Sequence, residues 1–266
     1  MRPREEYRTI RAALREKRNV MKAVMLRDMR SRFFNHGLGF LLVSLWPVAH
    51  ILILLTIYRL VGRIAPFGDS LAVFFASGLV PTLTFTYVSR FMGLSLILNK
   101  PMLAFPVVKV LDVMAARAVL EIIAAFVTLF FIFVILLISG ADPFPRDPFQ
   151  ALYAYLSVLL LAIGVGSLVG VITMFFRFFV TIYALFLIIV YLLSGTLFVA
   201  AALPAAAIYP LSFNPVLHAV EWMRLSYYEG YSTQILDKQY LIIFGLTALC
   251  LGLLMERLLR RIMLES

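Results

Sequence analysis

This chain of 266 residues has little charge, one cysteine and three histidines. Charged residues make up 14% of the chain and apolar residues 63%, whereas a soluble domain is roughly 25% charged and about half apolar. Cys250 cannot form a disulfide within the chain, and with His36, His50 and His218 it gives too few ligands for a metal cage. A soluble domain, a disulfide framework and a zinc enzyme are therefore excluded, and we expect no metal site.

Sequence motifs for nucleotide and metal chemistry are missing as well. None of the 14 glycines is followed by lysine, so the chain has no phosphate-binding loop of the G-x-x-x-x-G-K-[ST] type. Its aspartates are scattered over separate connections, which disfavours a membrane phosphatidyltransferase with clustered metal-binding aspartates. Ion-coupled carriers usually place acids inside their spans, and here only Glu121 lies in one. A carrier is therefore the weaker transporter hypothesis, and a membrane enzyme is weaker still.

Long runs without charge predict membrane-spanning helices, because a span needs about 20 apolar residues. The predicted spans are residues 38–58, 71–89, 119–139, 152–176, a fifth that ends near residue 202, and 240–255. The 43 residues between Arg177 and Glu221 carry no formal charge and are too many for one span. Pro204, Pro210 and Pro215 indicate where this stretch breaks. We expect an all-α integral membrane protein with six transmembrane helices and short external helices before the last span.

Lysine and arginine are distributed unequally between the two sides of this predicted bundle. Six spans place both termini on one side, which carries 19 Lys and Arg residues, and the other side carries 5. The positive-inside rule then predicts cytoplasmic termini. The same bias accounts for the net charge of +10 without a nucleic-acid partner.

The first 37 residues are predicted to form a cytoplasmic, basic interfacial helix, and residues 38–266 the six-span domain. From Met21 to Phe33, apolar side chains recur at near-helical spacing opposite Lys22, Arg27 and Arg30, as in a helix that lies in the headgroup layer. An Arg-rich start without a cleavage site is not a signal peptide. This helix either only anchors the chain on anionic lipid or also forms a cytoplasmic gate or partner surface.

Two connections carry unusual sequence. Within the cytoplasmic segment of about 94–117, residues 99–112 are rich in apolar side chains that a solvated loop does not need, which favours short helices bounded by Pro101 and Pro106 that face another protein. The alternative is that these side chains rest on lipid or on the bundle. The external segment of about 203–235, which we expect to be re-entrant, contains a helix start with Asn214 as N-cap and Pro215 at the first position.

Polar residues on that external helix are predicted to form one stripe, because His218, Glu221 and Arg224 recur at intervals of three. A hydrogen-bonded stripe is favoured over half of a metal site, with Glu221 and Arg224 paired either within the chain or across a dimer. In the fourth predicted span, Gly164 and the Gly166-x-x-x-Gly170 motif permit close helix approach, mainly within the chain and secondarily in a dimer. His50 is interpreted as a bundle histidine in preference to a substrate or proton site.

The order and spacing of several short motifs resemble the membrane subunit of type-2 ABC exporters, and most closely the permease of bacterial capsular polysaccharide export. These motifs are Leu26-Arg-Asp-Met-Arg-Ser-Arg-Phe33, Gly37-x-Gly-Phe, Pro47-Val-Ala-His50, Gly78-Leu-Val-Pro81, Pro106-Val-Val-Lys-Val-Leu-Asp112, Ala116-Arg-Ala-Val-Leu-Glu121 and Asn214-Pro-Val-Leu-His-Ala-Val-Glu221. The resemblance runs from about Met25 to the C-terminus. Trp46 departs from it, because an acidic residue is expected before the proline of the first span.

The resemblance implies a permease subunit of the bacterial inner membrane that is not itself an enzyme. Two copies would work with two separate ATPase subunits, which hold the ATP and magnesium, so no cofactor is expected on this chain. The implied substrate is a lipid-linked, often acidic capsular polysaccharide, passed on to periplasmic and outer-membrane export proteins. Alternatives are a permease for O-antigen or another lipid-linked glycan, a lipid or a drug.

Candidate site residues follow from the resemblance and from the motifs above. For contact with the ATPase they are Lys100, Phe105, Pro106, Val108, Lys109 and Asp112. For the cytoplasmic gate or entrance they are Arg27, Arg30, Arg32 and Phe33. For substrate passage and exit they are Trp46, His50, His218, Glu221, Trp222 and Arg224. The arginines could attract an anionic glycan, although the positive-inside rule alone would place them there.

Overall fold

The computed structural model describes residues 10–31 and 38–265, and within these ranges the chain is helical, with no strand. The helices are α1 (Ile10–Ser31), α2 (Leu38–Leu60), α3 (Leu71–Leu98), the 3₁₀ helix η1 (Lys100–Ala104), α4 (Val110–Ile138), α5 (Pro148–Phe175), α6 (Phe179–Leu192), the 3₁₀ helix η2 (Ala200–Ala202), α7 (Ala205–Leu211), α8 (Pro215–Tyr227) and α9 (Lys238–Glu265). The all-α class is confirmed.

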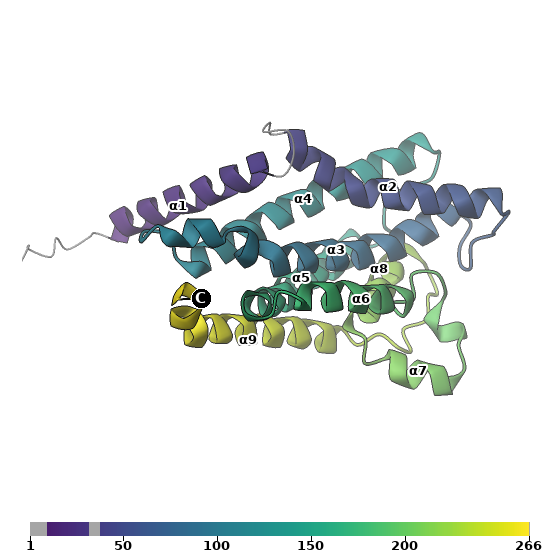
Figure 1. The fold of residues 1–266 in the computed structure, drawn as a ribbon. Helices are drawn as coiled ribbons and strands as arrows, with labels where there is room; N and C mark the ends of the chain where they lie inside the picture. Colours follow the sequence, from purple (N-terminus) through teal and green to yellow (C-terminus); the bar gives the residue numbers. More distant parts are fainter. Residues whose placement is uncertain (1–9, 32–37, 266) are drawn as a thin grey trace, which may run out of the picture.

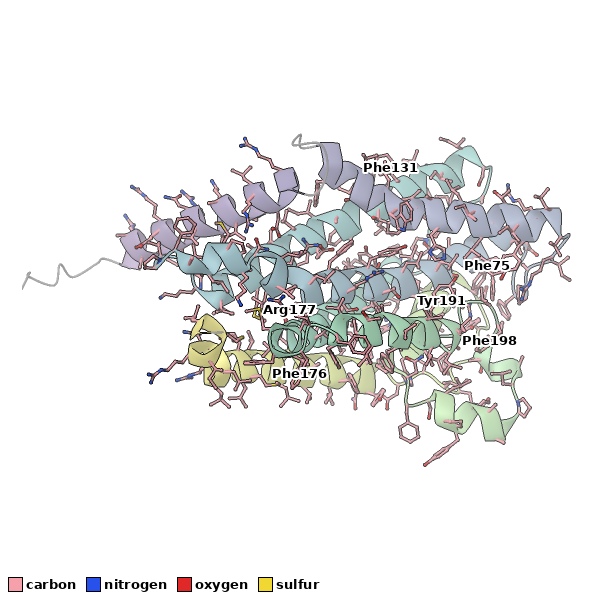
Figure 2. All side chains as sticks on the ribbon, viewed as in Figure 1. Phe75, Phe131, Phe176, Arg177, Tyr191 and Phe198 are labelled. Carbon is pink, nitrogen blue, oxygen red and sulfur yellow. The ribbon has the colours of Figure 1, made fainter. Side chains whose placement is uncertain are left out.

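Six helices run alternately up and down one elongated bundle (Figure 1). Helices α2, α4 and α6 run toward α7 and α8, while α3, α5 and α9 run back toward α1 (Figure 1). We call the end with α1, η1 and the last turns of α9 the α1 end, and the opposite end the α8 end. In Figure 2, Arg177 marks the turn that begins α6, and Tyr191 marks its other end.

Four of the described helices, α3, α4, α5 and α9, are long and apolar enough to cross a membrane. Of the other two, α6 is a short apolar helix, Phe179–Leu192, whose 14 residues fall below the roughly 20 of a straight span. Helix α2 has 23 residues, of which Arg59 is the one charged residue, so it does not fall short in length. The structure thus establishes four helices able to span a membrane. That α2 and α6 cross it as well is part of the function proposed below.

Helix ends differ from the predicted spans in an informative way. The fifth span was expected to end near residue 202, but α6 ends at Leu192, because the chain turns at Gly195, which has a φ of +71°. Helices α3 and α4 continue further toward the α1 end, so most of residues 94–117 is regular helix. Helix α9 extends past the predicted span to Glu265, with Glu256 paired to Arg260 one turn on.

Small residues bring α5 close to both of its neighbours. A Cβ on Gly166 would lie 2.8 Å from the Ser89 oxygen of α3, and one on Gly164 would lie 2.6 Å from the Gly245 oxygen of α9. Any larger side chain would push these backbones apart. The predicted role of Gly164 and Gly166 in packing within the chain is confirmed. Helices α3, α5 and α9 therefore form the tightly packed centre.

Many apolar side chains of α4 and α9 face outward. In an apolar stretch of 18 residues in each helix, 83% of the residues are buried in α3 and 67% in α5. The buried share is 28% in both α4 and α9. The exposed side chains include Phe126 and Phe130 on α4 and Leu246 and Leu254 on α9. An apolar surface this extensive is unsuited to water and fits a lipid environment.

Candidate functional site

The connection from α3 to α4 is short and exposes apolar side chains at the α1 end. It consists of η1 and residues 105–109, in which Phe105 is 59% exposed and Val107 53%. Pro106 and Lys109 are also exposed, whereas Lys100 and Val108 are half-buried. Val108 packs on a buried apolar cluster formed by the ends of α1, α3 and α4. The exposed surface that another protein could contact is therefore the Phe105 to Val107 turn.

Asp112, one of the residues predicted to contact the ATPase, is buried and points inward. Its Oδ2 accepts a hydrogen bond from the Lys109 backbone nitrogen at 3.3 Å, which satisfies a free donor at the start of α4. Its Oδ1 lies 3.6 Å from Lys17 Nζ of α1. Asp112 thus positions α4 against α1, and it does not offer a contact surface.

Helix α1 packs along α4 with the apolar face that the sequence predicts. Val24 is fully buried, and Met21 and Met25 pack beside it. Among the predicted gate residues, Arg27 is half-buried and donates from Nη1 to Asn99 Oδ1 at 3.0 Å, while Arg30 is exposed. Arg32 and Phe33 lie outside the described residues.

A groove runs between α1 and the connection from α3 to α4 at this end. Two adjoining cavities of about 610 and 450 Å³ share the side chains Glu16, Val20 and Val107. Arg11 and Arg15 line one of them, and Lys17, Lys109 and Asp112 line the other. The groove therefore combines an apolar floor with charges of both signs, which suits a protein surface.

A buried ion cluster at the α1 end was not predicted. Arg117 of α4 is 2% exposed; its Nη1 lies 3.4 Å from Asp28 Oδ2 of α1, and its Nη2 pairs with Glu121 one turn along α4. Its guanidinium also lies 5.1 Å from the ring centroid of Phe91. Two signals in the sequence pointed to it: Arg117 and Glu121 are four residues apart beside an apolar run, and Asp28 lies on the apolar face of α1.

The predicted passage residues of α2 differ in exposure. Trp46 is 66% exposed, whereas His50 is half-buried with its ring centroid 5.8 Å from that of Tyr191 on α6. Near the end of α2, Tyr58 stacks on Phe75 at 4.6 Å, and Arg63 lies over the Tyr58 ring at 4.7 Å. Trp46 and His50 lie on the same helix as this aromatic group but form no joint site with the residues of α8.

Helix α8 begins as the sequence predicts, with the Asn214 side chain accepting from Val216 N at 3.0 Å and Pro215 in the first turn. His218 is 2% exposed, its Nδ1 accepts from the Asp237 nitrogen at 3.0 Å, and its Nε2 lies 2.8 Å from the Ser212 oxygen. Nδ1 accepts, so Nε2 carries the proton and donates. His218 is a neutral histidine with both nitrogens occupied, which ties together the two ends of the external segment.

Glu221 and Arg224 are buried side by side in α8. Glu221 Oε1 accepts from Tyr231 Oη at 3.0 Å and lies 3.8 Å from Arg224 Nη1. Burial raises the pKa of the Glu221 carboxyl, while the nearby Arg224 charge and the bond from Tyr231 act to lower it. The predicted pairing of Glu221 with Arg224 occurs within one chain.

Arg224 also holds the backbone that follows α6. It donates to the Phe198 oxygen at 2.7 Å and the Thr196 oxygen at 3.0 Å, and its guanidinium lies 4.0 Å from the Phe74 ring centroid. The guanidinium therefore supplies donors to carbonyls that the broken helix leaves unpaired. Figure 2 shows Phe198 in this segment, beyond the end of α6 marked by Tyr191.

Trp222 faces the start of α5 instead of the Glu221 and Arg224 pair. Its Nε1 donates to Gln150 Oε1 at 2.7 Å, and Lys238 Nζ lies 5.0 Å from its ring. Among the described residues, no group of three or more acidic, histidine or cysteine side chains is arranged to hold a metal. The predicted residues thus fall into two places, the groove at the α1 end and the buried α8 network, with Trp46 and His50 between them.

Comparison with known proteins extends over most of the chain, although no protein-family model matches it. The polysialic acid transport protein KpsM of Escherichia coli is 29% identical over 247 residues, which cover 92% of this chain and 95% of KpsM. The capsule polysaccharide export inner-membrane protein CtrC of Neisseria meningitidis is 25% identical over 236 residues, 89% of each chain. BexB of Haemophilus influenzae, which carries the same description as CtrC, is 23% identical over 250 residues, 94% of each chain. The chain is thus similar, over most of its length, to a polysialic acid transport protein and to inner-membrane proteins of capsule polysaccharide export, which agrees with the resemblance that its motifs indicate.

Proposed function

We propose that this chain is the membrane permease of an ATP-driven exporter that moves lipid-linked capsular polysaccharide across the bacterial inner membrane. The observation that carries the proposal is similarity to three capsule-export proteins over at least 89% of this chain, in a fold with four helices able to span a membrane. One of these relatives is named for polysialic acid, an acidic glycan. The basic α1 end suits an anionic substrate.

All six alternating helices cross the membrane in this proposal, with both termini in the cytoplasm. Helix α2 is long enough to cross, and α6 completes the crossing with a short apolar part, which the bilayer accommodates by local thinning. Residues 1–37 form the cytoplasmic basic segment, residues 38–266 the transmembrane domain, and the segment with α7 and α8 lies at the external face. The α1 end is then cytoplasmic.

Two copies of the chain work with two separate ATPase subunits that bind ATP and magnesium. Each ATPase docks against the exposed Phe105 to Val107 turn and the groove beside α1. Lys100 and Lys109 lie at the edge of this surface, while Val108 and Asp112 support it from inside. The chain itself performs no hydrolysis, because it has no phosphate-binding loop.

Substrate enters beside α1 and leaves beside α8. Arg27 and Arg30 of α1, with Arg32 and Phe33 beyond its described end, form the entrance. Trp46 and His50 lie along the passage, where aromatic rings offer faces to sugars. His218, Glu221, Trp222 and Arg224 hold the external segment in shape and so define the exit. Periplasmic and outer-membrane proteins receive the glycan there.

The function is tested with the chain purified together with its co-expressed ATPase in lipid nanodiscs. We expect lipid-linked capsular glycan of the native host to stimulate ATP hydrolysis, the same glycan without its lipid to stimulate it less, and the chain alone to hydrolyse no ATP. Stimulation by a lipid-linked O-antigen and not by the capsular glycolipid would replace the proposed substrate by the alternative. Stimulation by neither would contradict the proposal.

A further inference from the structure

Helix α3 is buried along its first half and open along one side near the α1 end. Residues 72–85 are all buried. Beyond them Arg90 is exposed, and Tyr87, Leu94 and Ile97 are half-buried. These four positions follow one another at intervals of three or four residues, so they lie on the same side of the helix. We call this side, with Tyr87, Arg90, Leu94 and Ile97, the open face of α3.

Helices α2 and α6 border the open face without covering it. Tyr183 of α6 donates to Ser89 Oγ at 2.7 Å, and both side chains are buried. Trp46 of α2 lies within hydrogen-bonding reach of the Tyr87 hydroxyl. At 100° per residue, Ser89 and Tyr87 lie on opposite sides of Arg90 around the helix axis. Arg90 therefore projects between the part of α3 that α6 contacts and the part that α2 contacts.

The open face has an end toward the α8 end of the bundle. There His50 of α2 and Tyr191 of α6 lie with their ring centroids 5.8 Å apart, so the two helices meet over α3. Toward the α1 end, α3 stays open as far as Ile97, which is half-buried near the helix end. A molecule that arrives from the α1 end thus reaches Arg90 before it reaches the contact between α2 and α6.

Arg90 is the one charged residue of α3. It lies eight residues before the end of the helix, which is about 12 Å along the axis. Among the residues that the structure describes, no acidic side chain lies within 4 Å of its guanidinium. Arg117 and Arg224, by contrast, are buried and paired. A charge inside a span without a counter-ion in the chain indicates a functional site for an ion of opposite charge.

The side chains around Arg90 suit a sugar that carries a carboxylate. A guanidinium offers paired N–H donors in one plane, which match the two oxygens of a carboxylate. The Tyr87 ring lies one turn away, 6.4 Å from the ring of Phe91, and Trp46 beside it is exposed. Such rings offer an apolar face to a sugar, and the tyrosine hydroxyl offers a hydrogen bond to it. A lipid phosphate alone would need the arginine but not the rings.

We infer that Arg90, Tyr87 and Trp46 form a binding site for an acidic sugar unit of the glycan at the start of the passage between α2 and α6. The inference rests on the proposed function, because it places a glycan on this face of the chain. Arg90 pairs with the sugar carboxylate, while the rings of Tyr87 and Trp46 contact the sugar itself. The site therefore selects acidic glycans over neutral ones.

Arg257 of α9 offers a matched control for Arg90. It also lies eight residues before the end of its helix, is exposed, and has no described acidic side chain within 4 Å. Its exposed neighbours on α9 are Leu253, Leu254 and Leu258. The two arginines thus share depth and exposure, and they differ in the side chains beside them.

The test uses the complex of this chain with its co-expressed ATPase in lipid nanodiscs. It measures the glycolipid concentration that gives half of the maximal stimulation of ATP hydrolysis. One probe is the capsular glycolipid extracted from the native host. The other is the same glycolipid with its sugar carboxylates reduced to primary alcohols, a treatment that leaves any lipid phosphate intact. The variants are Arg90→Gln, Arg90→Lys, Arg257→Gln and Trp46→Ala, and size-exclusion chromatography checks that each complex assembles.

For the unsubstituted chain we expect the native glycolipid to act at a concentration about tenfold lower than the reduced one, as a hydrogen-bonded charge pair provides. Arg90→Gln should abolish this preference by weakening the native probe alone, and Arg257→Gln should keep it. Arg90→Lys retains the charge without the paired donors and should give a smaller preference. Trp46→Ala should weaken both probes alike, because the ring contacts the sugar whether or not it is charged.

Equal action of both probes on the unsubstituted complex would contradict the inference. So would an equal loss of both probes with Arg90→Gln, which would indicate a lipid phosphate or a general effect on the fold. If the Arg90→Gln complex did not assemble, Arg90→Lys would decide, and an undiminished preference there would contradict the inference. Failure of the native glycolipid to stimulate the unsubstituted complex would instead contradict the proposed function, which keeps the two failures distinct.

Discussion

Arg117 carries a buried charge, which costs free energy in a membrane bundle, and its ion pairs hold α1 against α4. Its guanidinium is 2% exposed and lies between carboxylates of α1 and α4. A charge in such a place is stable only while its partners remain, since removal of one partner leaves the others buried without compensation. The residue therefore fixes where α1 lies on α4 more firmly than apolar contacts alone would.

The first prediction concerns this cluster. Arg117→Met should destabilise the folded protein by about 3–5 kcal/mol, because Glu121 would lose its ion-pair partner inside the bundle and Asp28 would lose its contact with α4. The triple variant Asp28→Leu, Arg117→Met and Glu121→Leu should recover most of the loss, since it removes every charge of the cluster. The measurement is the melting temperature of the purified protein in detergent, followed by size-exclusion chromatography.

The matched control is Arg146→Met at the α8 end. Arg146 also pairs with an acid, Glu229, but their side chains are 57% and 80% exposed. Water and salt screen such a pair, so its loss should cost only about 0–1 kcal/mol. An equal drop in melting temperature for Arg117→Met and Arg146→Met would show that burial of the Arg117 cluster does not govern its strength.

Sequence reasoning at the residue scale succeeded where the signal was local. The Asn214 and Pro215 start of α8 follows from the preferences of a helix N-terminus, and the pairing of Glu221 with Arg224 follows from their spacing. It could not foresee that Arg224 binds the oxygens of Thr196 and Phe198, because those carbonyls come within reach only after the chain has folded. Arg117 was assigned to a loop for the related reason that α4 begins earlier than its apolar run.

At the scale of elements, the segment between α3 and α4 offers the clearest functional surface. The apolar side chains of residues 99–112 indicated a contact with another protein. In the structure, some of these side chains pack inward and others are exposed. Val108 packs inward on the buried cluster, whereas Phe105 and Val107 are 59% and 53% exposed. Aromatic and aliphatic side chains exposed beside charges are typical anchors of a protein interface.

The second prediction follows from that separation. Phe105→Asp with Val107→Asp should abolish co-purification with the ATPase and leave membrane insertion intact, because charges would be buried without partners in the interface. The measurement is recovery of the ATPase subunit with the tagged permease. Phe149→Asp serves as the control, since Phe149 is 70% exposed at the α8 end. Normal recovery from the double variant would remove this turn from the proposed docking surface.

At the scale of the whole molecule, charge-free runs located the six helices of the alternating bundle, because exclusion of charge from the apolar layer of a membrane is a strong and local constraint. Their ends were predicted less well. Nothing in a charge-free sequence marks where α6 stops, since the turn at Gly195 and the carbonyls that follow depend on contacts with α8. The predicted span lengths therefore erred most where the chain stays apolar after leaving the helix.

The last prediction decides whether α6 crosses the membrane. If α2 and α6 cross the membrane together with the four longer helices, the α5 to α6 turn is cytoplasmic and α7 is external. In the Cys250→Ser chain, Arg177→Cys should then react with an impermeant maleimide only after spheroplasts are permeabilised. Tyr209→Cys should react in intact spheroplasts, since Tyr209 is 71% exposed on α7.

Two further positions complete this test. Ala104→Cys at the α1 end should behave like Arg177→Cys, because both lie on the side that the positive-inside rule places in the cytoplasm. Glu229→Cys should behave like Tyr209→Cys, since the Glu229 side chain is 80% exposed at the α8 end. If α6 does not cross, Arg177→Cys and Tyr209→Cys must react on the same side of the membrane. That result would remove α6 from the membrane-spanning helices and would move α7 and α8 away from the exit of the substrate.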